Sequence, residues 1–476
     1  MKLKYIPKTK IICTLGPATA EVSSILKLMS NGMDAVRLNF SHGNYSEHRK
    51  YIQNLRIAEA KSGQPIAIIQ DLQGPKIRVG KLIKEPVKVF INSQIVLSTR
   101  VNDNPEFISV DYEHLHKELK RGDKLYIDDG KIKIEVLKVE DKRIYCKVLN
   151  TGEISSHKGI NLPNVKLGVP SITDKDKKDI LFGLKNDIDF IALSFVRSSN
   201  DIDELREFII KHSKKFSKKI PYILAKIEKQ EAINDLDNII IKSDGVLIAR
   251  GDLGIEIPIE NVPLIQKEII KKCREYTKPV IVATQMLESM IKNPLPTRAE
   301  VSDVANAVLD GADAVLLSGE TSIGNYPIEA VEMMNKIIQA IETGCHNRKV
   351  YEYKQREDYD ALAESAVMLS DEVGSKAIIA VTYSGRTATF ISKYRPAARI
   401  FGFTESIKVA RRLSIQWGVE SFVVPKIKGS TDSAFNKIHN QIISKRMLKK
   451  GDKYVVLAGL PFFEKNVLNT IKVFKV

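Results

Sequence analysis

One pattern, repeated along the first two-thirds of the chain, most constrains how this sequence can fold. A short apolar run ends abruptly in a polar or glycine-rich tip, as in DGVLIARGD at Asp244–Asp252. Runs without internal polar residues are typical of strands buried on both faces, which occur in parallel sheets covered by helices. Arg250, Gly251 and Asp252 then mark either a catalytic strand end or a strand-to-helix turn with a capping Asp.

The same pattern occurs eight times, and helix-like stretches with apolar residues at helical spacing lie between most neighbours. Eight strands alternating with helices predict a (β/α)₈ TIM barrel, whose active site lies at the carboxyl ends of the strands. We expect the barrel to comprise residues 1–72 and 167–345. The eight runs begin at Lys10, Gly32, Pro65, Asp187, Pro221, Asp244, Lys278 and Gly311.

One long interruption follows the third run. From about Gly80 to Asn161 the apolar residues alternate, and Asp129-Gly130 and Thr151-Gly152 are turn signals. This pattern predicts an all-β insert, assigned to residues 73–166. On the active-site face it could act as a lid that excludes water, or it could be a passive decoration.

After a polar connection at 346–360 the chain returns to alternating helix and strand, with SIKVARRLSIQWG as one of the helices, so residues 346–476 predict a separate open α/β domain. Within it SGRT, Ser384–Thr387, follows the strand KAIIAVT and begins a helix. Backbone N–H groups, hydroxyls and Arg386 favour an anion site there, and simple helix capping is the alternative.

Composition narrows the class of protein. The formal net charge is +16, but the lysines are distributed along the chain, so we expect no nucleic-acid partner. No apolar run is long enough to span a bilayer and no secretory segment follows Met1, so we expect a cytoplasmic protein without a membrane partner. The four cysteines form no CxxC pair, which argues against a zinc ribbon or a disulfide framework.

Carboxylates follow two neighbouring strands. Glu228 comes after the fifth run and Asp252 after the sixth. Hard oxygen ligands with room for water and substrate suit Mg²⁺. Lys226, two residues before Glu228, should point to the same side.

Further polar residues end the second, third, seventh and eighth runs, and their convergence on one rim predicts an active site. A metal, a lysine and an arginine around one point can hold a phosphoryl group, since phosphoryl transfer depends on positioning and charge neutralisation. The P-loop and protein-kinase motifs are absent from the sequence, so a barrel kinase of another type is implied. The additional rim residues are Arg37, Asn39, Ser41, Asp71, Thr284, Ser318 and Glu320.

Motifs over nearly the whole chain resemble those of the pyruvate kinases. CTLGP, VRLNFSHG, LPN, KIE, ARGDLGIEIP, ATQMLESM and LSGETSIGNYP stand in the order of that family. The resemblance implies transfer of phosphate from phosphoenolpyruvate to ADP, giving pyruvate and ATP in the last step of glycolysis. It also implies Mg²⁺ or Mn²⁺ as cofactor and a homotetramer.

The resemblance also assigns roles. Glu228 and Asp252 would bind the metal, and Lys226 the transferring phosphoryl group. Gly251, Asp252 and Thr284 would bind the substrate carboxylate and Arg37 its phosphate. Arg78, Lys158 and His42 would contact the nucleotide, and Thr284, Ser318 and Glu320 would belong to the path that protonates the enolate.

Two other functions compete with this one. An aldolase or lyase barrel that handles pyruvate or phosphoenolpyruvate would also place metal carboxylates at strand ends, but it would not need Arg78, Lys158 or a nucleotide-covering lid. A basic binding protein on an inactive barrel would not need Lys226, Glu228 and Asp252.

The sequence departs from the family at the monovalent-cation site. Asn39, Ser41 and Asp71 are present, but Leu72 and Lys76 stand where K⁺-dependent members have a hydroxyl and a carboxylate. Two like charges about 4 Å apart repel by roughly 4 kcal/mol at an effective dielectric near 20. We therefore expect Lys76 to substitute for K⁺, which would not be required.

The second departure concerns regulation. AGLPF, Ala458–Phe462, stands where sugar-phosphate-activated members begin a glycine-rich loop, but here it continues with Glu464 and no glycine. We expect a weaker or altered effector response, with a single phosphate at Thr382, Ser384, Gly385, Arg386 and Thr387.

Overall fold

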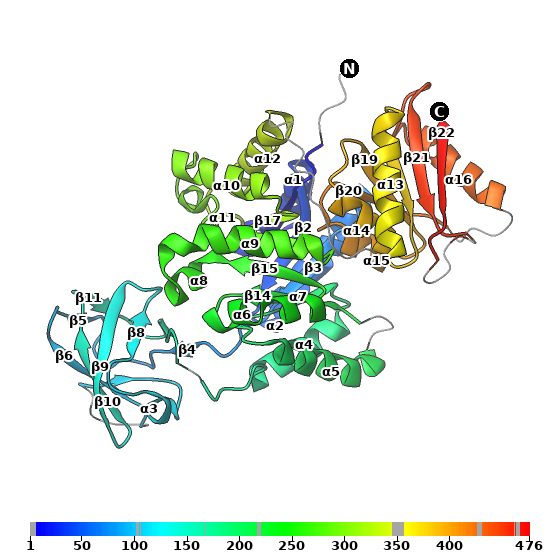
Figure 1. Cartoon of the computed structure of the whole chain (residues 1–476). Coiled ribbons are helices and arrows are strands. Elements are labelled where there is room, and N and C mark those ends of the chain that lie inside the picture. Colours follow the sequence, from blue (N-terminus) through cyan, green and yellow to red (C-terminus); the bar gives the residue numbers. More distant parts are fainter. Residues whose placement is uncertain are drawn as a thin grey trace.

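The computed structural model describes residues 6–100, 104, 106–165, 167–216, 220–344, 357–425, 431–460, 462 and 467–476. Eight parallel strands form a closed barrel in the order β1-β17-β16-β15-β14-β13-β3-β2 (Figure 1). The predicted (β/α)₈ barrel is confirmed. Its strands are β1 (Lys10–Thr14), β2 (Met33–Asn39), β3 (Ala67–Asp71), β13 (Phe190–Leu193), β14 (Tyr222–Ile227), β15 (Gly245–Ala249), β16 (Val280–Ala283) and β17 (Ala314–Leu317).

Helices surround the barrel, and their ends carry the capping residues that the sequence supplies. Asn44 accepts hydrogen bonds from the backbone N–H groups of Ser46 and Glu47, and Gly63 ends that helix with φ of 70°. The covering helices are α1 (Val22–Ser30), α2 (Tyr45–Ser62), α4 (Asp174–Lys185), α5 (Ser199–Phe216), α6 (Gln230–Asn234), α7 (Leu236–Lys242), α8 (Arg250–Glu256), α9 (Val262–Glu275), α10 (Arg298–Asp310), α11 (Gly319–Ser322) and α12 (Pro327–Gly344), with 3₁₀ turns η1 (Pro17–Thr19), η2 (Ile259–Asn261) and η3 (Glu288–Ile291).

The insert after β3 is a separate β structure that extends away from the barrel (Figure 1). One sheet has the order β4-β12-β8-β9-β10-β6-β7, and β11 pairs with β5. The alternating run VKVFINSQIVLST forms two strands rather than one, because the chain turns at Asn92, where φ is 66°. The elements are β4 (Ile77–Arg78), β5 (Val87–Val89), β6 (Gln94–Ser98), β7 (Ile108–Ser109), α3 (Leu115–Glu118), β8 (Lys124–Ile127), β9 (Ile132–Glu140), β10 (Arg143–Val148), β11 (Gly152–Ile154) and β12 (Gly159–Asn161). The helical turn α3 was not expected in an all-β insert.

The C-terminal domain is an open sheet with the order β20-β19-β18-β21-β22, flanked by helices, as predicted. The antiparallel edge strand β22 was not predicted. The connection expected at 346–360 lies mostly outside the described residues. The elements are α13 (Asp358–Glu372), β18 (Ala377–Val381), α14 (Arg386–Lys393), β19 (Arg399–Thr404), α15 (Ile407–Leu413), β20 (Val419–Val423), α16 (Thr431–Ser444), β21 (Lys453–Ala458) and β22 (Thr470–Lys475).

The segment after α15 joins this domain to the barrel. The sequence SIKVARRLSIQWG predicted a helix through Gly418, but the helix ends at Leu413. Ile415 beyond it is fully buried and packs with apolar residues of the barrel interior such as Leu224 and Phe190. The helix therefore ends where the chain turns into the closed end of the barrel, opposite the predicted active site.

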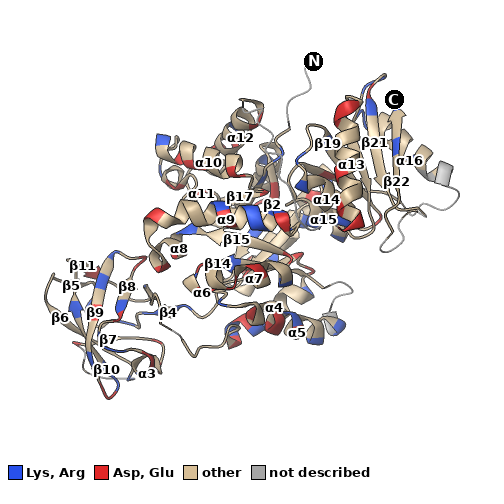
Figure 2. Cartoon of the chain, in the orientation of Figure 1, with Lys and Arg blue, Asp and Glu red and all other residues tan. Residues whose placement is uncertain are grey.

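Charged residues are spread over the insert, the barrel helices and the C-terminal domain (Figure 2). This is the distribution that the sequence suggested. Within the described ranges, none of the helices has the length and hydrophobicity needed to cross a membrane.

Candidate active site

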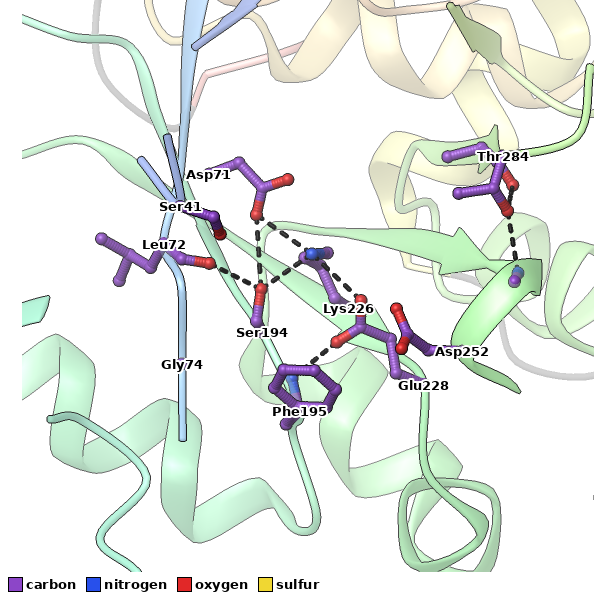
Figure 3. A network of polar contacts seen from close by, with 12 residues as sticks. Ser41, Asp71, Leu72, Gly74, Ser194, Phe195, Lys226, Glu228, Asp252 and Thr284 are labelled. Carbon is purple, nitrogen blue, oxygen red and sulfur yellow. Dashed lines mark hydrogen bonds and ion pairs between the residues drawn. The ribbon is translucent and has the colours of Figure 1, made fainter. Parts of the chain in front are cut away.

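Lys226 lies at the centre of a polar cluster at the carboxyl end of the barrel (Figure 3). Its Nζ donates to Ser194 Oγ at 2.7 Å and lies 3.1 Å from Asp71 Oδ1 and 3.0 Å from Glu228 Oε1. Burial alone would lower the pKa of Lys226, but Asp71 and Glu228 raise it above its usual value. The side chain is therefore a fixed, fully charged ammonium.

Asp71 ties two cations to the end of β3. Arg37 Nε donates to Asp71 Oδ2 at 2.6 Å, while the other carboxylate oxygen faces Lys226. Arg37 also donates to Thr14 Oγ1 at 3.1 Å. Burial would raise the pKa of the Asp71 carboxyl, but Lys226 and Arg37 outweigh it and hold that pKa below its usual value. The arginine is thereby oriented toward the rim.

Glu228 and Asp252 lie on neighbouring strand ends with their carboxyl groups turned toward each other (Figure 3). Burial raises the pKa of Glu228, Lys226 opposes this, and the charge of Asp252 raises it further. Phe195 donates its backbone N–H to Glu228 Oε2 at 2.7 Å. The φ of Phe195 is +56°, an uncommon conformation for a bulky residue, so the backbone is locally strained where it positions this donor.

These two carboxylates fit a divalent cation. Their mutual repulsion is relieved by a positive charge, and oxygen ligands are those that Mg²⁺ prefers. Among the described residues there is no group of three or more His, Cys, Asp or Glu side chains placed to hold a metal. A metal on Glu228 and Asp252 would complete its shell with water and substrate, as Mg²⁺ commonly does.

Lys76 contacts the second of these carboxylates. Its Nζ donates to Asp252 Oδ1 at 2.8 Å and lies 3.7 Å from Asp129 Oδ1 of the insert. A Cβ added at Gly159 would lie 2.5 Å from Lys76 Cε, so glycine provides room for this side chain. The Lys76 ammonium, expected beside the predicted monovalent-cation site, thus pairs with Asp252.

The other residues of the predicted monovalent-cation site lie at the ends of β2 and β3. Asn39 Oδ1 accepts a hydrogen bond from the backbone N–H of Ser41 at 3.1 Å. Leu72 is buried, with 1% of its surface exposed, in the apolar cluster between barrel and helices. Its backbone carbonyl accepts from Ser194 Oγ at 2.7 Å.

Thr284 and Gly251 are in contact across the ends of β16 and β15. The Gly251 N–H donates to Thr284 Oγ1 at 2.9 Å. Thr284 has φ of +68°, which is an outlier for a β-branched residue and marks a strained strand end. Arg250 turns away from the rim, because NH1 donates to Asp303 Oδ1 at 2.7 Å and NH2 to the Thr284 carbonyl.

Ser318 and Glu320 follow β17. The Glu320 carboxylate accepts from the backbone N–H groups of Ser318 at 2.7 Å and Leu287 at 3.2 Å. Burial raises its pKa. This carboxylate therefore links the backbone segments that follow β16 and β17, a structural role that the sequence did not indicate.

The residues expected to contact the nucleotide are anchored separately. Arg78 donates through NH1 to the His157 carbonyl at 3.0 Å, and Lys158 Nζ lies 3.0 Å from Asp128 Oδ1. His42 is exposed, and its carbonyl lies 3.0 Å from His48 Nε2. Arg78 and Lys158 both belong to the insert.

The SGRT segment borders a cavity of about 390 Å³ between the C-terminal domain and the closed end of the barrel. Ser384, Gly385, Arg386 and Arg412 are among its lining residues. Arg386 pairs with Glu357, and Thr382 Oγ1 accepts from the Gly385 N–H at 2.9 Å. Thr387 is buried at the first turn of α14. Glu464 lies outside the described residues.

Comparison with known proteins decides the family. Residues 6–331 match the model of the pyruvate kinase barrel domain, and residues 360–474 match that of the pyruvate kinase alpha/beta domain. The chain belongs to the pyruvate kinase family. It is 43% identical to a pyruvate kinase of Geobacillus stearothermophilus over 98% of this chain and 80% of that protein. It is 41% identical to a pyruvate kinase of Clostridium acetobutylicum over 98% and 99%.

A solved pyruvate kinase structure from Cryptosporidium parvum superposes with a TM-score of 0.92, at 40% identity, covering 98% of this chain and 96% of that one. The predictions of a pyruvate kinase fold and of a phosphotransferase are confirmed, and the aldolase and non-enzymatic alternatives are wrong.

Two residues of the cluster were not predicted. Ser194 links Lys226 to the end of β3, and Phe195 fixes Glu228. Both belong to SFVR, which directly follows the run FIAL of β13. The signal was their position at a barrel strand tip, like that of Asp71 and Glu228.

Proposed function

We propose that this pyruvate kinase family member transfers the phosphoryl group of phosphoenolpyruvate to ADP at the cluster around Lys226, giving pyruvate and ATP in the last step of glycolysis, in the cytoplasm. The contact of one ammonium with Asp71, Ser194 and Glu228 carries this proposal. A charge fixed by three partners needs no reorganisation when phosphoryl charge moves past it.

The substrate would lie between the two sides of the cluster. Gly251 and Asp252 through their backbone N–H groups in the first turn of α8, and Thr284 through its hydroxyl, would bind its carboxylate, and the Gly251 N–H would then donate to a substrate oxygen instead of Thr284 Oγ1. Arg37, oriented by Asp71, would bind the phosphate. Lys226 would stabilise the phosphoryl group in transit, because its charge lies between both subsites.

Glu228 and Asp252 would hold Mg²⁺ or Mn²⁺. When bound, the metal supplies Lewis-acid stabilisation of the developing negative charge. Phe195 and Lys226 keep the Glu228 carboxylate in one orientation for that purpose. Thr284, Ser318 and Glu320 would belong to the path that delivers a proton to the enolate.

The insert would close over the nucleotide as a lid. Arg78 and Lys158 on the insert and His42 at the rim would contact the nucleotide phosphates, and closure would keep water from the phosphoryl group. Arg78 now donates to a carbonyl, and Lys158 forms an ion pair in which the lysine side chain is 42% exposed, so both side chains can exchange these partners for phosphate oxygens.

We also propose that K⁺ is not required. Both oxygens of Asp71 already face cations, Arg37 and Lys226, so an additional K⁺ there gains little. Leu72 supplies no side-chain ligand. Lys76 would supply the positive charge that K⁺ otherwise brings to the nucleotide side of the site. Its partner there is Asp252 and not Asp71.

The assembly would be the homotetramer that the family resemblance implies, whereas the effector response would differ from that of sugar-phosphate-activated members. Exposed apolar side chains of the barrel domain support a homotetramer, as does the edge strand β22 of the C-terminal sheet. A phosphorylated effector would bind at Thr382, Ser384, Gly385, Arg386 and Thr387. The uncovered barrel residues are Ile259, Leu264, Leu295 and Ile323.

The test is a coupled assay of pyruvate formation from phosphoenolpyruvate. Pyruvate should appear only when ADP and Mg²⁺ or Mn²⁺ are both present, with ATP formed in equal amount. Pyruvate formed at the same rate without ADP would contradict phosphoryl transfer to a nucleotide.

A further inference from the structure

The Asp252 carboxylate can pair with two cations, the Lys76 ammonium and a divalent metal. This inference rests on the metal site proposed above. The carboxylate that would bind a divalent cation already accepts a hydrogen bond from Lys76 Nζ at 2.8 Å. The side chains are only 17% and 23% exposed, so water screens the pair poorly. A cation that binds Asp252 must displace this ammonium or tolerate its repulsion.

Lys226, the lysine that pairs with Glu228, is held more firmly than Lys76. Lys226 has three oxygen partners within 3.1 Å and lies in the barrel core, so it cannot move without losing all three. Within the described residues Lys76 has one ion-pair partner closer than 3 Å, and it lies where the chain leaves the barrel for the insert. It also lies 3.7 Å from Asp129 Oδ1 and 5.7 Å from the centre of the Phe195 ring, and the charge of Glu228 acts on it from farther away.

We propose that Lys76 occupies Asp252 as a built-in competitor of the divalent cation, so that metal binding releases the Lys76 ammonium. The released ammonium lies between barrel and insert, where anionic substrate arrives. Because linkage is reciprocal, the lysine weakens metal binding by the same factor by which the metal loosens the lysine.

The expected size follows from the strength of the pair. A hydrogen bond to a charged group contributes enough that its removal changes an equilibrium by roughly tenfold. Replacing Lys76 by an uncharged residue should therefore tighten metal binding about tenfold in the absence of substrates.

The experiment is a titration of the full-length protein with Mn²⁺ alone, in which loss of the electron paramagnetic resonance signal of free Mn²⁺ reports binding. Lys76→Met and Lys76→Gln should both bind Mn²⁺ about tenfold more tightly than the wild type. Lys76→Arg, which keeps the cation, should not. Lys131→Met removes an exposed insert lysine paired with Asp128 and should match the wild type.

The variant Asp129→Asn distinguishes competition at Asp252 from an effect of the insert acting as a lid. It removes the insert partner of Lys76 but leaves Lys76 paired with Asp252. If Asp129→Asn tightened Mn²⁺ binding as Lys76→Met does, or if both uncharged Lys76 variants bound no more tightly than the wild type, the competition would be refuted. Asp252→Asn tests the underlying site. Unchanged Mn²⁺ binding in that variant would refute the metal assignment itself, whereas weakened binding leaves only the role of Lys76 in question.

Discussion

Lys226 Nζ and Glu228 Oε1 lie 3.0 Å apart, two positions from each other at the end of one strand. The cation proposed to stabilise the phosphoryl group and a carboxylate proposed to bind the metal are therefore in contact before any ligand arrives. Such preorganisation is the main source of catalysis in phosphoryl transfer.

Loss of either metal carboxylate should lower kcat. Glu228→Gln and Asp252→Asn should each cost about 4 kcal/mol of transition-state stabilisation, close to a thousandfold in rate, because Lewis-acid assistance is lost. Steady-state kinetics across a range of Mg²⁺ concentrations check this. Glu256→Gln is a matched control, since Glu256 is also buried and paired with a lysine, Lys229. Near-native kcat at ordinary Mg²⁺ in either site variant would contradict the assignment.

Activity should persist without K⁺. With Na⁺ and K⁺ replaced by a bulky organic cation, the wild type should keep most of its activity, because Arg37 and Lys226 already neutralise Asp71. Lys76→Glu combined with Leu72→Thr should create K⁺ activation by restoring a hydroxyl and a carboxylate. Large K⁺ activation of the wild type would show the idea to be mistaken.

The barrel was predictable because its strands are buried on both faces. Runs such as GVLIA of β15 contain nothing polar and admit few other interpretations. The edge strand β22 was missed because TIKVFK is half-exposed along its length and carries two lysines. The end of α15 was missed because what ends it, the packing of Ile415 into the barrel, is a tertiary contact.

The site was predictable to the level of which residues converge, and not of which atoms pair. Lys226 and Glu228 are neighbours in sequence, so their common direction followed from strand periodicity. Lys76 and Asp252 are 176 positions apart, and their pairing depends on where the insert returns to the barrel. Likewise Arg250 is charged and at a strand tip, yet it bonds Asp303 behind the rim.

The effector response should depend on Arg386. We expect at most weak activation of the wild type by fructose 1,6-bisphosphate, and loss in Arg386→Ala of any response to a monophosphorylated sugar. Arg399→Ala, which removes an arginine paired with Glu420 elsewhere in the domain, should respond as the wild type does. Strong fructose 1,6-bisphosphate activation that survives in Arg386→Ala would rule out this site.

The contact between barrel and C-terminal domain should weaken in acid. Burial would raise the pKa of Glu59, but Arg411 and Arg56 hold it below its usual value. Its stabilisation is therefore complete above the ordinary Glu pKa of about 4.3 and is lost as the pH falls through the lower folded value.

At pH 7 Glu59→Gln should destabilise the protein by about 2 kcal/mol, because the partly buried Arg411 loses its close carboxylate partner and keeps only the weaker pairing with Asp187 at 3.7 Å among the ion pairs of the described residues. Urea unfolding should show this difference shrinking at pH 3.5. Glu332→Gln, which breaks an exposed pair with Lys336, should have almost no effect at either pH. A Glu59→Gln difference that grows on acidification would have the wrong sign for this linkage.

The kinetics of Lys226→Met are the sharpest test of whether Lys226 stabilises the phosphoryl group in transit. Lys393→Met is the control, since Lys393 is equally buried and pairs with Asp360 far from the site. With phosphoenolpyruvate and ADP varied in turn, Lys226→Met should lose at least about a thousandfold in kcat with KM values within a fewfold of the wild type, because its charge matters where charge moves. Lys393→Met should keep kcat. A Lys226→Met enzyme with near-native kcat and only a raised KM would show that Lys226 binds substrate without stabilising the phosphoryl group in transit.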